Sequence, residues 1–204
     1  MGQCKSCNAS PANEVEGVHQ FNVSLSRAAD ESLGVELDFM DMVTGRVIEL
    51  DDKGAIAKAG MGLKRGDHIL AVNGASTALR IMKRLKEDEE IDILVERPME
   101  FRIDLVKGAE GVGLDLSHAP RGDTLLIRNL TSKGAIQEWN EKKKSVAQVK
   151  RLDRIVEVNS IRGKAAELLA ELKSQDKLTI IISPGPRTME EDMQPHGVPA
   201  EYVA

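Results

Sequence analysis

The chain has 204 residues, of which 41% are hydrophobic and 30% charged, a composition that supports an ordinary folded core in one large or two small domains. The formal net charge of −5 argues against nucleic acid as the main partner, because binding of its backbone needs a concentrated excess of Lys and Arg. Aromatic side chains make up only 2%, so stacking on bases is also not expected. No apolar run approaches the ~20 residues that span a bilayer and no signal-peptide pattern opens the chain, so we expect a cytoplasmic protein.

The N-terminal segment, residues 1–19, begins "MGQCKSC" and contains both cysteines of the chain, Cys4 and Cys7. Gly2 and Ser6 fit the N-myristoylation pattern M-G-x-x-x-[ST]. A single myristoyl chain holds a protein at a membrane only marginally, so lasting attachment needs a second signal. This segment carries one Lys against two Glu and offers no basic patch. The pattern therefore favours myristate on Gly2 with palmitate on Cys4 and Cys7, which would place the protein on the cytoplasmic face of the plasma membrane or the Golgi.

Two other interpretations of the cysteine pair stay open, namely metal or redox use and an unmodified terminus. Structural zinc needs four ligands, and the four histidines are scattered along the chain without pair spacing. A redox C-x-x-C motif normally lies at the start of a helix in a folded domain, whereas this one precedes any periodic pattern. We expect no metal site and no cofactor.

The rest of the chain contains the same order of features twice. Each copy starts with an apolar strand, "FNVSLSR" or "FRIDLVK", and continues with an alternating strand, a third strand and the sequence "KGAI", where a glycine turn precedes a short helix. A buried strand ending in an Asn turn, an amphipathic helix and a last apolar strand complete the copy. This order predicts an α+β protein, mainly β, with two partly open barrel or sandwich domains, each capped by a short and a long helix.

The expected domains are residues 20–98 and 99–184, joined at Pro98 without a linker. Residues 185–204 are rich in Pro and Gly and predict a disordered C-terminal tail. The second copy has an extra loop around Lys142–Lys144, which we interpret as a plain solvated insertion rather than a site for phosphate or an acidic partner.

Both copies resemble PDZ domains, and the resemblance covers residues 20–183. The sequences "SLGV" (Ser32–Val35) and "GVGL" (Gly111–Leu114) are similar to the carboxylate-binding loop of that family. Further similarity lies in "LKRGDHILAVNG" and "VKRLDRIVEVNS", where Leu152 and Ser160 replace glycines of the first copy. A lone "LGV" would be unspecific, but the ordered set occurs twice. The resemblance implies a peptide-binding domain with no enzymatic activity.

The resemblance also implies roles for individual residues. A ligand's terminal carboxylate would be received by backbone N–H groups of the loop, with help from a basic residue before it, and the terminal side chain would lie against apolar residues of the strand and the long helix. In the first copy these residues are Leu33, Gly34, Val35, Leu37, Met82 and Leu85, with Arg27 as the basic residue. In the second copy they are Val112, Gly113, Leu114, Leu116, Leu169 and Leu172, with Lys107.

Selectivity in this family depends on the first residue of the long helix, where a His selects Ser or Thr in the ligand. By counting, that position falls at Ala78 and Ala165, which cannot hydrogen-bond. We therefore expect ligands with apolar-x-apolar C-termini.

The function that these features favour is a membrane-tethered scaffold or adaptor that binds C-terminal peptides. The alternative is a soluble, self-associating protein whose grooves are idle or bind its own terminus, Tyr202-Val203-Ala204. An enzyme is disfavoured, because the sequence contains no recognisable triad elbow, P-loop or metal motif.

Overall fold

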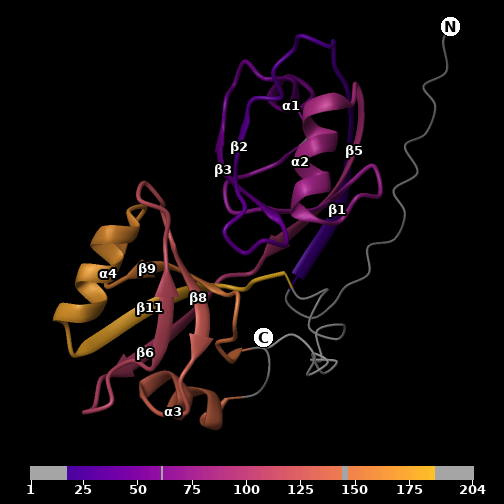
Figure 1. Cartoon of the computed structure of the whole chain (residues 1–204). Helices are drawn as coiled ribbons and strands as arrows, with labels where there is room; N and C mark the ends of the chain where they lie inside the picture. The colour runs from indigo at the N-terminus through magenta and orange to yellow at the C-terminus, as the bar shows by residue number, and fades with distance from the viewer. Residues whose placement is uncertain (1–17, 61, 144–146, 187–204) are drawn as a thin grey trace, which may run out of the picture. The chain divides into compact units, whose positions relative to one another are not determined.

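The computed structural model describes residues 18–60, 62–143 and 147–186, and the chain divides into two compact units between Met99 and Glu100 (Figure 1). Each unit is described by itself below. In both, one antiparallel sheet is combined with a short and a long helix, so the predicted α+β fold class is confirmed.

The first unit contains a five-stranded sheet in the order β1-β5-β4-β3-β2, so β1 and β2 are its edge strands. Helix α2 lies over this sheet (Figure 1). The elements are β1 (Val18–Ser26), β2 (Val35–Asp38), β3 (Gly45–Leu50), α1 (Ala55–Lys58), β4 (His68–Val72), α2 (Ala78–Glu87) and β5 (Glu90–Pro98).

The second unit repeats this order, with the path β6-β11-β9-β8-β7 and a short additional strand, β10, beside β9. The two sheets are open, because the strands at the two ends of each path are not paired with each other in the described part of the chain. The elements are β6 (Phe101–Val106), β7 (Leu114–Ser117), β8 (Leu125–Leu130), α3 (Ala135–Lys142), β9 (Arg154–Val158), β10 (Ile161–Arg162), α4 (Ala165–Ser174) and β11 (Lys177–Ser183).

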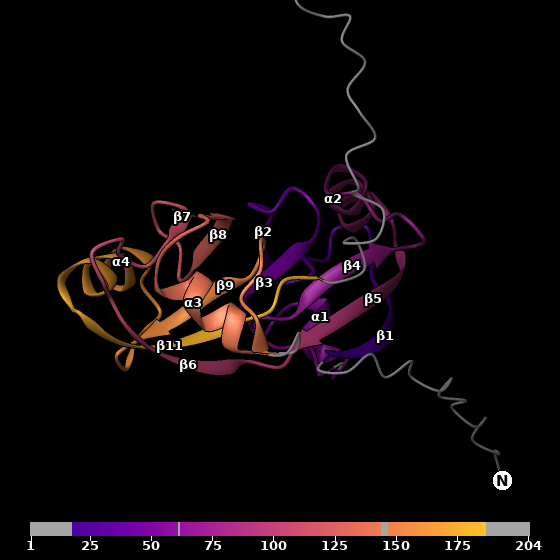
Figure 2. The same ribbon diagram turned by 90° about the horizontal axis from the view of Figure 1, so that it is seen from below.

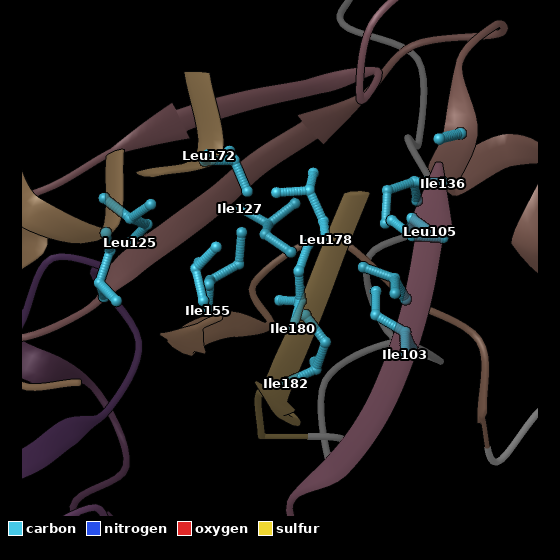
Figure 3. Close-up of a cluster of buried hydrophobic side chains, with 14 of the residues drawn as sticks. Ile103, Leu105, Leu125, Ile127, Ile136, Ile155, Leu172, Leu178, Ile180 and Ile182 are labelled. Carbon is cyan, nitrogen blue, oxygen red and sulfur yellow. The ribbon is translucent and has the colours of Figure 1, made fainter. Parts of the chain in front are cut away.

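Alternation along the strands and a stripe on each long helix supply the two cores. In the first unit, Ala78, Ile81 and Leu85 are the buried residues of α2, and Ile81 and Leu85 pack with buried Val and Ile side chains of β3, β4 and β5. In the second unit, buried side chains of β6, β8, β9 and β11 gather with Leu172 of α4 (Figure 3). Aliphatic side chains dominate both clusters, as the scarcity of aromatics predicts.

The two glycine replacements in the second copy keep the backbone conformation of the glycines. Gly66 and Gly74 have φ of 92° and 76°, and Leu152 and Ser160, which stand at the matching places, have φ of 70° and 69°. Left-handed conformations are unfavourable for residues with a Cβ. The second copy therefore retains both turns at a cost in backbone strain.

No helix among the described residues is long and apolar enough to cross a membrane. The same residues contain no group of three or more His, Cys, Asp or Glu side chains arranged to hold a metal ion.

Candidate peptide-binding edges

The strands that follow the predicted carboxylate loops, β2 and β7, are edge strands. β2 pairs only with β3, and β7 only with β8, so one side of each carries backbone groups without a neighbouring strand among the described residues. The N–H of Asp51 donates to the Gly34 carbonyl at 2.8 Å, and Val35 lies opposite Leu50. Because backbone groups alternate in direction along a strand, the N–H and C=O of Val35 point away from β3. The N–H and C=O of Leu114 point away from β8 in the same way, since the N–H of Thr131 donates to the Gly113 carbonyl at 3.0 Å and Leu114 lies opposite Leu130.

The loop before β2 has its carbonyl groups bound on the inner side. The carbonyls of Ser32 and Leu33 accept hydrogen bonds from Ala55 and Ile56, at the start of α1, at 3.0 and 3.2 Å. Among the described residues the N–H of Leu33 has no acceptor, while the N–H of Gly34 donates to the Ser32 hydroxyl at 3.2 Å. The loop thus presents N–H groups outward, the polarity that an anion requires.

The second loop repeats the first one. The carbonyls of Gly111 and Val112 accept from Ala135 and Ile136 at the start of α3, both at 3.1 Å. In this part of the chain the N–H groups of Val112 and Gly113 have no protein acceptor. The second loop therefore offers one more uncommitted donor than the first.

Close packing of two glycines fixes each loop. Gly34 has φ of 71°, and a Cβ on it would lie 2.5 Å from the Cα of Gly54. In the second unit Gly113 has φ of 83°, and a Cβ on Gly134 would lie 2.8 Å from the Cα of Gly113. We predicted Gly54 and Gly134 only as turn residues. Their second role, as the backbone against which the loop packs, had one sequence signal, the recurrence of "KGAI" at nearly the same distance from each loop, 20 residues from Gly34 to Gly54 and 21 from Gly113 to Gly134.

The apolar residues predicted to receive a ligand side chain gather beside the core. Leu33, Val35 and Leu37 are partly buried against the cluster that contains Ile81 and Leu85. The matching group in the second unit packs against the cluster that contains Leu168 and Leu172, and consists of Val112, Leu114, Leu116 and Leu169. The structure thus brings most of the predicted residues together in each unit.

The residues predicted at the helix start and flank differ in exposure. α2 begins at Ala78 and α4 at Ala165, as counted from the sequence, and both alanines are buried, at 5% and 1% exposure. Met82 is 40% exposed and Leu169 is partly buried. Among the residues predicted on these helices, Met82 and Leu169 are therefore more exposed than the two alanines.

The two basic residues predicted to assist the carboxylate bind carbonyl groups at the ends of the long helices. Arg27 donates to the carbonyls of Leu85 and Lys86 through Nη2, at 3.0 and 2.7 Å, and to Glu31 and Asp88 through its other nitrogens. Lys107 Nζ donates to Leu172 and Lys173 at 3.2 and 2.9 Å. Cations at helix C-termini are stabilising. Both side chains therefore stabilise the C-terminal ends of the long helices, and their role in binding a ligand carboxylate stays a prediction.

A pocket of about 250 Å³ opens on the first loop and the first strand pair. Its lining consists of Ser32, Gly34, Val35, Glu36, Glu49 and Asp51. Glu36 lies opposite Glu49 across β2 and β3. Three carboxylates in one pocket repel a further anion on this face, so a ligand carboxylate would have to approach the outward N–H groups from the sheet edge. No sequence pattern had predicted this pocket.

The lipidation candidates Gly2, Cys4 and Cys7 and the terminal residues Tyr202, Val203 and Ala204 lie outside the described residues.

No protein-family model matches the chain, and no curated protein matches it. Two solved structures align with most of it. One, described as INAD PDZ45 in complex with NG2 peptide, is 18% identical, with a TM-score of 0.35, and the alignment covers 90% of this chain and 98% of that one. The other, a complex of INAD PDZ45 and NORPA CC-PBM, is 19% identical, with a TM-score of 0.35, and 86% and 96% of the two chains are covered.

Proposed function

We propose that the chain is a non-enzymatic scaffold whose two units are PDZ-like domains that bind C-terminal peptides by strand addition to β2 and β7. The observation that carries the proposal is the loop before each edge strand. Its carbonyls are bonded to the start of a helix and to the end of the neighbouring strand, and at least one of its N–H groups is left without an acceptor among the described residues. The same arrangement occurs in both units, beside the same kind of apolar cluster.

In this mode the ligand carboxylate binds the outward N–H groups of the loop, and the ligand backbone pairs with the free side of the edge strand. Every second side chain of the ligand then points toward the edge strand and the long helix. The terminal one lies against Leu33, Val35 and Leu37, or against the equivalent residues of the second unit. Because Ala78 and Ala165 offer no hydrogen bond, apolar-x-apolar C-termini fit best.

Each site alone should bind in the micromolar range, about −8 kcal/mol. Two sites on one chain raise the apparent affinity for a partner that presents two C-termini, because the second binding event occurs at high local concentration. Gathering membrane-protein C-termini is the use that this arrangement favours.

The proposal includes a membrane tether made of myristate on Gly2 and palmitate on Cys4 and Cys7, at the plasma membrane or the Golgi. Its support is the sequence pattern together with the absence of a basic patch in residues 1–20. The mass of the N-terminal peptide from native cells, with thioesters kept intact, tests it. An unmodified or acetylated terminus would refute the tether and leave a cytoplasmic adaptor.

Peptide binding is tested by calorimetry with a peptide that ends in Val-x-Val and the same peptide with an amidated terminus. We expect micromolar binding of the acid and a loss of ~10-fold or more for the amide, because the loop N–H groups lose a charged acceptor. Met82→Glu and Leu169→Glu together should weaken the acid peptide, and thermal unfolding checks that the variant is folded. Equal affinity for acid and amide would refute carboxylate recognition.

A second candidate is an adaptor whose peptide sites are idle. The contacts of Arg27 favour it, because this side chain already donates four hydrogen bonds to carbonyls of its own unit. The same calorimetry separates the two functions, since idle sites bind neither peptide. Self-capping by Tyr202-Val203-Ala204 stays a prediction, and deletion of these residues should strengthen peptide binding if it occurs.

A further inference from the structure

Strand β1 forms the other edge of the first sheet, and it is the longest edge strand in the described part of the chain. It spans nine residues, "VHQFNVSLS", without Asp, Glu, Lys, Arg or Pro. The edge strands β2, β6 and β7 are four to six residues long and each carries at least one charge. Charges, prolines and short length are the usual features that prevent a sheet edge from pairing with another chain. β1 has none of them.

The backbone of β1 offers a continuous row of donors and acceptors on its free side. β1 pairs with β5 from Val18 to Ser26 in one unbroken register, and the N–H of Arg27 donates to Glu89 at 3.0 Å. Because backbone groups alternate in direction along a strand, the N–H and C=O groups of Val23 and Leu25 point toward β5, and those of Asn22 and Ser24 point away from it.

The contacts of Asp92 agree with this assignment. Asp92 lies opposite Ser24, yet its carbonyl and its N–H both bond Asn73, at 2.8 and 2.7 Å. Figure 2 shows β1 as the outermost strand beside β5.

The side chains at the middle of this edge are polar, exposed and uncharged. Gln20 and Ser26 bond carboxylates of β5, Glu96 and Glu90, at 2.8 and 2.6 Å. Asn22 and Ser24, between them, are exposed and have no hydrogen-bond partner among the described residues. The centre of the edge thus has free hydrogen-bonding capacity in both its backbone and its side chains.

We infer that β1 is a self-association edge, which pairs antiparallel with β1 of a second copy of this chain. A two-fold axis at Val23 would place Asn22 of each copy opposite Ser24 of the other, so that an amide meets a hydroxyl on both sides of the axis. Such a pair is self-complementary, as a two-fold interface requires. The outward backbone groups of the two strands would bond each other, as in any antiparallel ladder.

Charge repulsion opposes this pairing only weakly, although the first unit is acidic. By this register the nearest carboxylates on this face are Glu90 of one copy and Glu96 of the other, which would lie level with each other with their backbones three strand spacings apart, about 14 Å. This exceeds the screening length of ~8 Å at physiological ionic strength. Edge strand β6 of the second unit differs, because Arg102 and Asp104 form an ion pair of 2.8 Å on its exposed face. β1 is therefore the favoured edge for a second copy.

This inference is independent of the proposed function, because β1 and β2 are opposite edges of the same sheet. A dimer through β1 leaves β2 unpaired and doubles the number of candidate peptide sites in one assembly.

The test uses the full-length chain and two variants with opposite charge, Asn22→Lys/Ser24→Lys and Asn22→Glu/Ser24→Glu. Sedimentation velocity over a concentration series should show a dimer for the unaltered chain. Each variant alone should dimerise about 100-fold or more weakly, because like charges would face each other. An equimolar mixture of the two should form a heterodimer. This rescue does not depend on the exact register and separates a direct contact from a folding defect.

Two single variants complete the design. Ser24→Pro removes an N–H that faces away from β5, so it should give a folded monomer. Ser24→Thr keeps the edge uncharged and should remain dimeric. The inference is overturned if the unaltered chain is monomeric throughout the series, or if the charged variants and Ser24→Pro dimerise as the unaltered chain does. Peptide affinity should be the same in all of these variants, which keeps this result distinct from failure of the peptide sites.

Discussion

Gly34 and Gly54 pack backbone against backbone, so closely that a Cβ on Gly34 would lie 2.5 Å from the Cα of Gly54. The contact fixes the loop that precedes β2, where the N–H groups proposed to bind a carboxylate are presented. Two residues twenty positions apart in the sequence thus hold the loop together, and Gly113 and Gly134 make the equivalent contact in the second unit.

Gly34→Ala should destabilise the first unit and abolish its peptide binding. The left-handed backbone costs about 1–2 kcal/mol for a residue with a Cβ, and the clash with Gly54 adds to this. Gly60→Ala is the matched control, because Gly60 also has a positive φ, 64°, but open space around its Cβ position. Chemical denaturation should show a clearly larger loss of unfolding free energy for Gly34→Ala. Equal losses would show that the contact with Gly54 is unimportant.

Arg27→Ala should lower the stability of the first unit by about 1–3 kcal/mol, since four carbonyls lose a charged donor. Three of them belong to the end of α2 and the residue that follows it, those of Leu85, Lys86 and Asp88. Arg80 lies on α2, is exposed and has no hydrogen-bond or ion-pair partner among the described residues. Arg80→Ala is the control and should leave the free energy of unfolding nearly unchanged. If the two variants unfold alike, capping by Arg27 is not stabilising.

The order of strands and helices could be predicted from the sequence because it depends on local periodicity. The starts of α2 and α4 and the edge position of the strand after each glycine loop followed from the pattern and the resemblance. The capping role of Arg27 could not be predicted, because its acceptors Leu85 and Lys86 lie almost sixty residues away and only the fold brings them near. The two-residue strand β10 was missed for the opposite reason, since it is too short to show a period.

Asp104→Asn should reduce stability at neutral pH and have a progressively smaller effect in acid. Hydrogen bonds from Arg102 and Thr179 lower the pKa of Asp104 below its ordinary value. A carboxyl with a lowered pKa in the folded state contributes stability above its unfolded pKa, and the contribution is lost as the pH falls through the folded value. Thermal unfolding from pH 7 to pH 2 should show the melting curves of the two proteins converge below the ordinary pKa of Asp.

The control for this experiment is Asp30→Asn, at an exposed position without a hydrogen-bond partner among the described residues. Its effect on the melting temperature should be small at every pH. A constant difference between the unaltered chain and Asp104→Asn across the range would contradict the assigned interaction with Arg102.

Asn140→Ala should release the lysine-rich insertion of the second unit. The Asn140 side chain donates to the Val149 carbonyl and accepts from its N–H, both at 2.8 Å, which joins α3 to the residue that follows the predicted insertion around Lys142–Lys144. Trp139, the single tryptophan of the chain, donates to Ala147 at 2.8 Å in the same loop and serves as a probe. We expect faster tryptic cleavage at these lysines and a red shift of tryptophan fluorescence. Gln137→Ala, on the same helix but outside this clamp, should change neither.

Exchange of the turn residues between the two copies should change their stabilities in opposite directions. Ser160 and Gly74 stand at the same turn position, with φ of 69° and 76°. Ser160→Gly removes left-handed strain from a residue with a Cβ, and after the larger chain entropy of glycine in the unfolded state is subtracted, the net gain is about 0.5–1 kcal/mol.

Gly74→Ser should destabilise the first unit by a similar amount, since no neighbouring atom lies within 4 Å of its Cβ position and only the backbone strain is added. Chemical denaturation of both variants measures the two effects. A loss of stability in Ser160→Gly would mean that the serine side chain stabilises the turn through a contact that outweighs its backbone strain, so that serine is the more stable residue at this position of the second copy.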